Sequence, residues 1–63
     1  MNRYIYSGPV MEFDVCVAMA WTGETMAVSE KRARSNLAFQ YKRETGRTPS
    51  TKITLPGKII MKG

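Results

Sequence analysis

The chain has 63 residues, and its ten basic side chains against five acidic ones give a formal net charge of +5. A chain this short forms a single domain, here residues 1–63, close to the lower size limit for independent folding. Because it has one cysteine and no histidine, an internal disulfide and a zinc site of the usual Cys/His kind are excluded.

The sequence has no segment that predicts a membrane location. Its longest apolar run covers only residues 15–21, whereas a spanning helix needs about 20 residues. The start of the chain lacks the pattern of a signal peptide. A lone cysteine without such a leader is typical of a reducing compartment. We therefore expect a cytoplasmic protein with no membrane partner.

The first part of the chain is predicted to be a β-hairpin. Residues 10–19 alternate, with Met11, Phe13, Val15, Val17 and Met19 on one parity, which predicts a strand with one buried face. We expect Thr22-Gly23 to reverse the chain and residues 24–28 to return as a second strand. Trp21 would then lie at the hairpin end and cover the core.

The residues before this hairpin leave two alternatives open. Ser7-Gly8-Pro9 is a cluster typical of a chain turn. Residues 3–6 are therefore expected to form either a short strand or an extended arm.

One long helix is predicted from Glu30 to Thr45, a segment free of Gly and Pro. Ser29 can cap its first turn, and Glu30 suits the positive end of the helix dipole. Gly46 is in the position of a glycine that ends a helix.

A helical wheel separates this segment into two faces. Ala33, Leu37, Ala38 and Tyr41 fall within an arc of about 140°, which predicts the face that packs on a sheet. Glu30 and Arg34 can pair at its edge, because they are four residues apart. The opposite arc carries Ser35 and the residues Lys31, Arg32, Phe39, Lys42 and Arg43.

The tail alternates again, and Leu55-Pro56-Gly57-Lys58 matches the residue preferences of a type II turn. Two short strands, or one strand bent at Pro-Gly, are both compatible with it. The predicted fold is α+β: a small antiparallel sheet on a single helix, in the order β-β-(β)-α-β.

Catalytic chemistry is not indicated. Cys16 has no histidine to act as its base, so we interpret it as a packed, unreactive side chain. Glu12 and Asp14 are interpreted as a solvated strand face, and no phosphate-binding glycine motif is present. We expect no enzyme activity, no cofactor, no metal and no small-molecule substrate.

Charge is distributed unevenly along the chain. Residues 1–29 carry Arg3 against three acids, a net charge of −2, whereas residues 30–63 carry nine bases against Glu30 and Glu44, a net charge of +7. Such asymmetry favours a polyanionic partner. The candidate nucleic-acid-binding residues are Lys31, Arg32, Phe39, Lys42, Arg43, Arg47 and Lys52. An aromatic ring among bases can stack on an unpaired base of DNA or RNA.

Three stretches together resemble a family of small uncharacterised proteins from phages and conjugative elements of Gram-positive bacteria. They are YSGPVMEFDVCVAMAW, ETMAVSEKRARSNLAFQYKRETGR and KITLPGKI, which cover nearly the whole chain. The resemblance implies a mobile-element context and no activity.

The predicted function is therefore accessory nucleic-acid binding through the basic helix face. The alternative is a protein-interaction module, or a homodimeric adaptor, that binds an acidic protein partner. A homodimer would cover an open strand edge or an aromatic patch.

Overall fold

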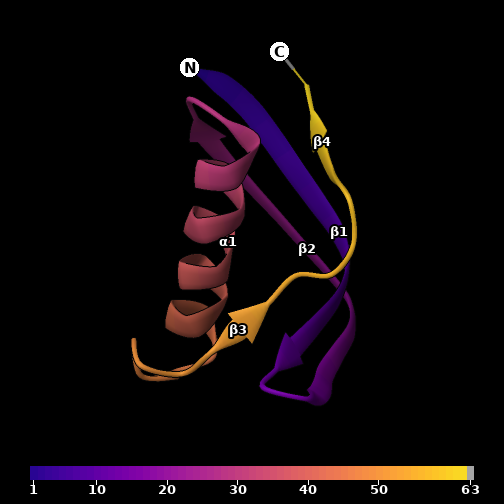
Figure 1. Cartoon of the computed structure of the whole chain (residues 1–63), viewed down its shortest axis with the longest axis vertical. Helices are drawn as coiled ribbons and strands as arrows, with labels where there is room; N and C mark the ends of the chain where they lie inside the picture. The colour runs from indigo at the N-terminus through magenta and orange to yellow at the C-terminus, as the bar shows by residue number, and fades with distance from the viewer. Residues whose placement is uncertain (63) are drawn as a thin grey trace.

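The computed structural model describes residues 1–62, so Gly63, the last residue of the predicted domain, lies outside the described part. One helix packs on one face of a four-stranded antiparallel sheet (Figure 1). The elements are β1 (Asn2–Glu12), β2 (Val15–Ala27), α1 (Glu30–Glu44), β3 (Ile53–Thr54) and β4 (Ile59–Met61). The predicted α+β class is confirmed.

A long hairpin of β1 and β2 forms most of the sheet. Asn2 lies opposite Ala27 at one end and Glu12 lies opposite Val15 at the other, so the chain reverses at Phe13-Asp14. The predicted reversal at Thr22-Gly23 is wrong, because both residues lie within β2. Phe13 has a φ of 54°, a backbone conformation that normally selects glycine. Asp14 is therefore the only turn-favouring residue of this reversal, and no glycine marks it in the sequence.

The Ser7-Gly8-Pro9 cluster does not turn the chain either. It lies inside β1, where the pairing register shifts between Gly8 and Val10 and again between Val10 and Met11. Proline has no N–H to donate to a strand partner and is tolerated at such irregularities. Residues 3–6 are therefore part of a regular strand rather than an arm.

These register shifts also overturn the predicted buried face of residues 10–19. The side chains of Phe13, Val15 and Met19 are 59%, 63% and 85% exposed. Simple alternation fails because the two register shifts interrupt it, whereas Val17, which has the same parity, still packs beside the core. The core is instead formed by Tyr4, Tyr6, Val10, Ala27, Ala33, Leu37, Tyr41, Ile53, Leu55 and Ile59.

The tail forms two short strands on the same side of β1. Strand β3 pairs with Met11 and Glu12, and β4 pairs with residues 4–6. The predicted type II turn between them is wrong, because such a turn needs a positive φ at its glycine and Gly57 has none. The segment instead crosses the gap in an irregular, extended path (Figure 1).

The helix ends are as predicted. The Ser29 side chain accepts a hydrogen bond from the backbone N–H of Arg32 at 3.2 Å, which caps the first turn. At the other end Gly46 has a φ of 72°. The N–H of Gly46 donates to the carbonyl of Arg43, and the N–H of Arg47 donates to that of Lys42. This is a Schellman motif, which satisfies the last carbonyls of the helix.

The inner face of α1 also packs as predicted. Ala33, Leu37 and Tyr41 are buried, and Ala38 packs beside them. Trp21 lies within β2 rather than at a hairpin end, yet it covers the core, with its ring 5.3 Å from that of Tyr41 in an edge-to-face arrangement. The opposite face of α1 is thereby left to solvent.

Candidate nucleic-acid interface

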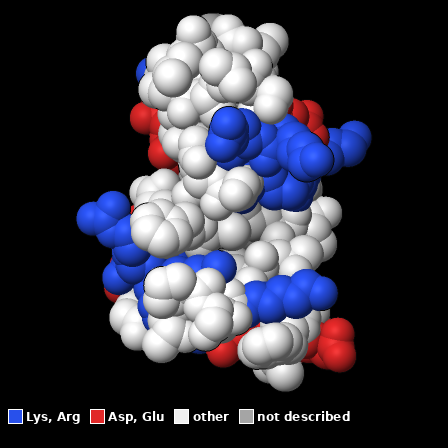
Figure 2. Space-filling view, turned by 60° about the vertical axis from the view of Figure 1, so that its left-hand side comes forward, with Lys and Arg blue, Asp and Glu red and all other residues white. Residues whose placement is uncertain are grey.

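The outer face of α1 carries the predicted helical site residues. Lys31, Arg32 and Arg43 are exposed, and Lys42 is half-buried. Phe39 projects from the same face and is 50% exposed. Figure 2 shows the Lys and Arg side chains in separate groups with uncharged atoms between them and acidic atoms towards the rim. The sequence therefore placed these five side chains on the correct helix face.

The basic side chains fall into two classes. Three arginines form ion pairs: Arg3 with Glu24, Arg34 with Glu30 and Arg47 with Glu12. Within residues 1–62, none of the four bases on the outer helix face has a carboxylate within ion-pair distance. Three of the five acids are thus bound to arginines elsewhere, which leaves the positive charge of this face without a partner from the described chain.

Phe39 forms a ridge between two shallow hollows. The hollow towards β3 is lined by Lys31, Arg34, Ser35, Ala38, Phe39, Lys42, Ile53, Thr54 and Leu55, and it includes no acid. The hollow towards β2 is lined by Glu24, Thr25, Asn36, Phe39, Gln40, Arg43 and Glu44. The two sides of the ridge therefore differ in charge, and only the β3 side is purely basic.

Glu24 and Glu44 explain this difference. The Glu44 carboxylate accepts hydrogen bonds from Trp21 Nε1 at 3.3 Å and from Gln40 Nε2 at 3.0 Å. These contacts hold it in the hollow that Arg43 also lines. Trp21 of β2 thus holds the Glu44 carboxylate on the sheet side of the helix.

Arg47 and Lys52, the two candidates beyond the helix, differ in their surroundings. Arg47 Nε lies 3.0 Å from Glu12 Oε1, and its guanidinium stacks 5.3 Å from the centre of the Tyr41 ring. Its side chain is only 25% exposed, so it joins the helix end to β1. Lys52 is exposed, and its carbonyl accepts a hydrogen bond from the N–H of Phe13.

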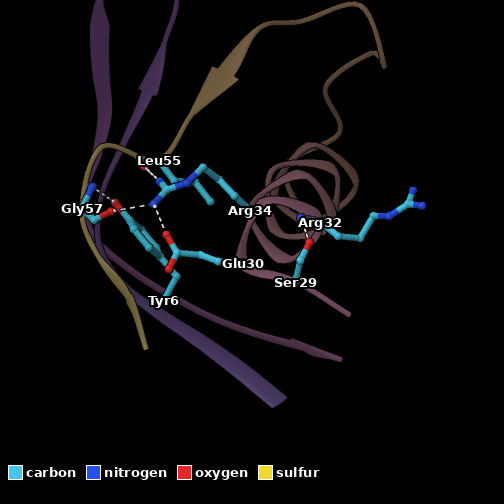
Figure 3. A network of polar contacts seen from close by, with 7 residues as sticks. All are labelled: Tyr6, Ser29, Glu30, Arg32, Arg34, Leu55 and Gly57. Atoms are coloured by element: carbon cyan, nitrogen blue, oxygen red, sulfur yellow. Dashed lines mark hydrogen bonds and ion pairs between the residues drawn. The ribbon is translucent and has the colours of Figure 1, made fainter. Parts of the chain in front are cut away.

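Arg34 has a structural role that sequence reasoning found only in part. Its predicted pairing with Glu30 is present at 3.8 Å. Its guanidinium also donates to the carbonyls of Leu55 and Gly57. Figure 3 shows Arg34 pointing from the helix towards this segment, whereas Arg32 points away from it into solvent. The same helix therefore carries one arginine that holds the tail, Arg34, and another that is free in solvent, Arg32.

Lys42 has one local contact. Its Nζ donates to the carbonyl of Pro49 at 3.1 Å. This bond positions the ammonium group over the loop that follows the helix. It leaves the charge uncompensated, because the acceptor is a neutral carbonyl.

Cys16 is exposed, so the interpretation of a packed side chain is wrong. It falls in the short stretch between the register shifts and the hairpin turn, where few side chains reach the core. Its Sγ lies 3.3 Å from the carbonyl of Ala18.

Within residues 1–62 no three His, Cys, Asp or Glu side chains are grouped so that they can hold a metal ion. The helix in this part of the chain lacks the length and apolar character needed to cross a membrane. Comparisons of the chain with protein-family models, with curated proteins and with solved structures found no match.

Proposed function

We propose that this protein binds nucleic acid through the outer face of α1. The observation that carries the proposal is the division of the ionic side chains. Arginines that hold the fold together are neutralised by carboxylates, whereas Lys31, Arg32, Lys42 and Arg43 form no ion pair with another described residue. Uncompensated, exposed bases on one helix face are the electrostatic footprint of a phosphate-binding surface.

The spacing of the bases suits several phosphates rather than one. Lys31 and Lys42 lie eleven positions apart, which is about 16 Å along a helix axis. A nucleic-acid strand carries one phosphate about every 3.4 Å in a duplex, so the two ammonium groups contact different phosphates. Binding of this kind depends on charge and not on base sequence.

Phe39 adds an aromatic surface on which a base can stack, which the basic side chains cannot supply. Its half-exposed ring stands between the two hollows, within one helical turn of Ser35, Lys42 and Arg43. A base stacked on an aromatic ring contributes about 1–3 kcal/mol. Only an unpaired base can reach such a ring, so the proposal favours single-stranded over duplex nucleic acid.

An acidic protein partner is the alternative class of ligand for the same bases. The mobile-element context implied by the sequence resemblance stays a prediction, and it is compatible with either ligand. Affinity for nucleic acid falls steeply with salt, with a slope of about −0.9 per phosphate contacted on a duplex and about −0.7 on a single strand.

The test is a titration of fluorescently labelled single- and double-stranded DNA and RNA with the purified protein at two salt concentrations. Arg32→Glu combined with Arg43→Glu is expected to lose most of the affinity and to flatten the salt slope. The matched control, Lys58→Glu combined with Lys62→Glu, changes the net charge equally at exposed positions outside the helix. It is expected to retain most of the affinity.

Two results would reject the proposal. The first is no binding of any of the four nucleic acids by the wild-type protein at low salt. The second is an equal loss in both double variants, since this would mean that net charge matters and the helix face does not. Phe39→Ala separates base stacking from phosphate binding. It is expected to weaken binding of single strands and to leave binding of duplexes unchanged.

A further inference from the structure

The two edges of the sheet are built differently. Along one edge β3 and β4 have only 2 and 3 residues, and Pro56 lies between them. Lys52, Lys58 and Lys62 flank these strands. Short strands, prolines and lysines are the usual protection of a sheet edge against pairing with another chain.

The other edge lacks every one of these protections. Strand β2 has 13 residues, and in the described part of the chain it pairs only with β1. It contains no proline or lysine, and its one charged residue, Glu24, is already paired with Arg3. Outside the irregular stretch opposite Gly8–Met11, its outer side therefore presents backbone N–H and C=O groups whose natural partner is another β-strand.

We propose that a second copy of this chain pairs with β2, strand against antiparallel strand. Such an interface is isologous, so each copy supplies the strand that the other copy needs. An antiparallel pair of identical strands is related by a two-fold axis perpendicular to the sheet. Both helices then lie on the same face of one continuous sheet.

Exposed apolar side chains occur where this pairing would cover them. The hairpin end carries Phe13, Val15 and Met19, which are 59%, 63% and 85% exposed. We place the two-fold axis near the middle of β2. The hairpin end of each copy then lies beside the half of the other copy's β2 that the helix covers. Each copy thereby shields the apolar end of the other.

Electrostatics permits the approach of two chains that each carry a net charge of +5. The β2 edge itself is the least basic part of the molecule, with Glu24 as its only charge. Lys31 and Lys42 line the hollow on the β3 side of the helix, away from this edge. Pairing through β2 therefore keeps Lys31 and Lys42 of the two copies apart, and it does not depend on nucleic-acid binding.

The first experiment combines sedimentation equilibrium with amide hydrogen exchange by NMR, in the presence of a reductant that keeps Cys16 free. Mass is expected to rise from monomer to dimer with concentration. In a monomer, alternate amides of β2 point away from β1 and exchange quickly; in the dimer they are expected to become protected. A monomer mass at every concentration, with those amides always exchanging quickly, would overturn the proposal.

The second experiment places a lysine on each edge. Met19→Lys is at an exposed β2 position that has no partner in the β1 register, and it is expected to raise the dimer dissociation constant at least tenfold. Ile60→Lys is the matched control on β4, where the side chain is 57% exposed, and it is expected to leave that constant unchanged. Circular dichroism checks that both variants fold. Equal dissociation constants in the two variants would show that β2 is not the interface.

Discussion

The hydroxyl group of Tyr6 accepts a hydrogen bond from the backbone N–H of Gly57 at 3.0 Å and donates one to the carbonyl of Pro9 at 2.5 Å. These bonds join the irregular part of β1 to the crossing segment between β3 and β4. Both strands of the tail are too short to hold that segment by themselves. The buried phenol of Tyr6 therefore helps Arg34 to fix the segment between β3 and β4.

Replacing Tyr6 by phenylalanine is expected to lower the free energy of unfolding by about 1–3 kcal/mol, because an N–H and a carbonyl lose their partner in a part-buried site. Urea denaturation followed by circular dichroism measures this loss. Tyr4→Phe is the matched control: Tyr4 is also buried, yet its hydroxyl has no hydrogen bond to another described residue. Equal losses in the two variants would contradict the role assigned to Tyr6.

Leu37→Ala is expected to cost about 2–5 kcal/mol, which is enough to unfold so small a domain. Leu37 is fully buried in the middle of the helix face that packs on the sheet. The loss of cooperative thermal unfolding would be the observed result. Asn36→Ala, at the neighbouring exposed position, serves as the control and should melt at or slightly above the wild-type temperature, because alanine is the better helix former. A well-folded Leu37→Ala protein would contradict the packing described here.

Arg34→Lys is expected to loosen the tail even though it keeps the charge. The guanidinium reaches the carbonyls of both Leu55 and Gly57, and a lysine ammonium lacks the fork needed to bond both. Hydrogen exchange of the β4 amides should become faster, while exchange of the amides at the centre of α1 should change little. Arg32→Lys, on the solvent side of the helix, is the control for the charge-conserving substitution (Figure 3). Unchanged β4 exchange in Arg34→Lys would refute the proposed anchoring.

Phe13→Gly is expected to stabilise the fold by up to about 1 kcal/mol. The positive φ of 54° costs a residue with a Cβ about 1–2 kcal/mol, and the greater freedom of glycine in the unfolded chain offsets part of the gain. Little packing is lost, because the ring is exposed. Urea denaturation at low protein concentration measures this change without a contribution from the proposed self-association. A lower midpoint in this variant would mean that the ring makes contacts that outweigh the backbone strain.

The features that the sequence determined by itself are local ones. The cap at Ser29, the glycine stop at Gly46 and the Glu30–Arg34 pair each depend on residues within a few positions of one another. The two faces of α1 follow equally directly, because helical periodicity is constant across 15 residues. For this reason the helix and the bases on its outer face were predicted correctly.

Only the tertiary structure decided which residues the sheet buries and which charges remain free. The turn at Phe13 is stabilised by the bond from its N–H to the carbonyl of Lys52, and two register shifts interrupt the alternation of inward and outward side chains. Arg47, expected to be available for nucleic acid, is instead paired with Glu12, a residue 35 positions earlier in the chain. Glu44 was likewise drawn towards β2 by Trp21. Such pairings depend on which segments meet in space, and the spacing of residues along the chain does not encode that information.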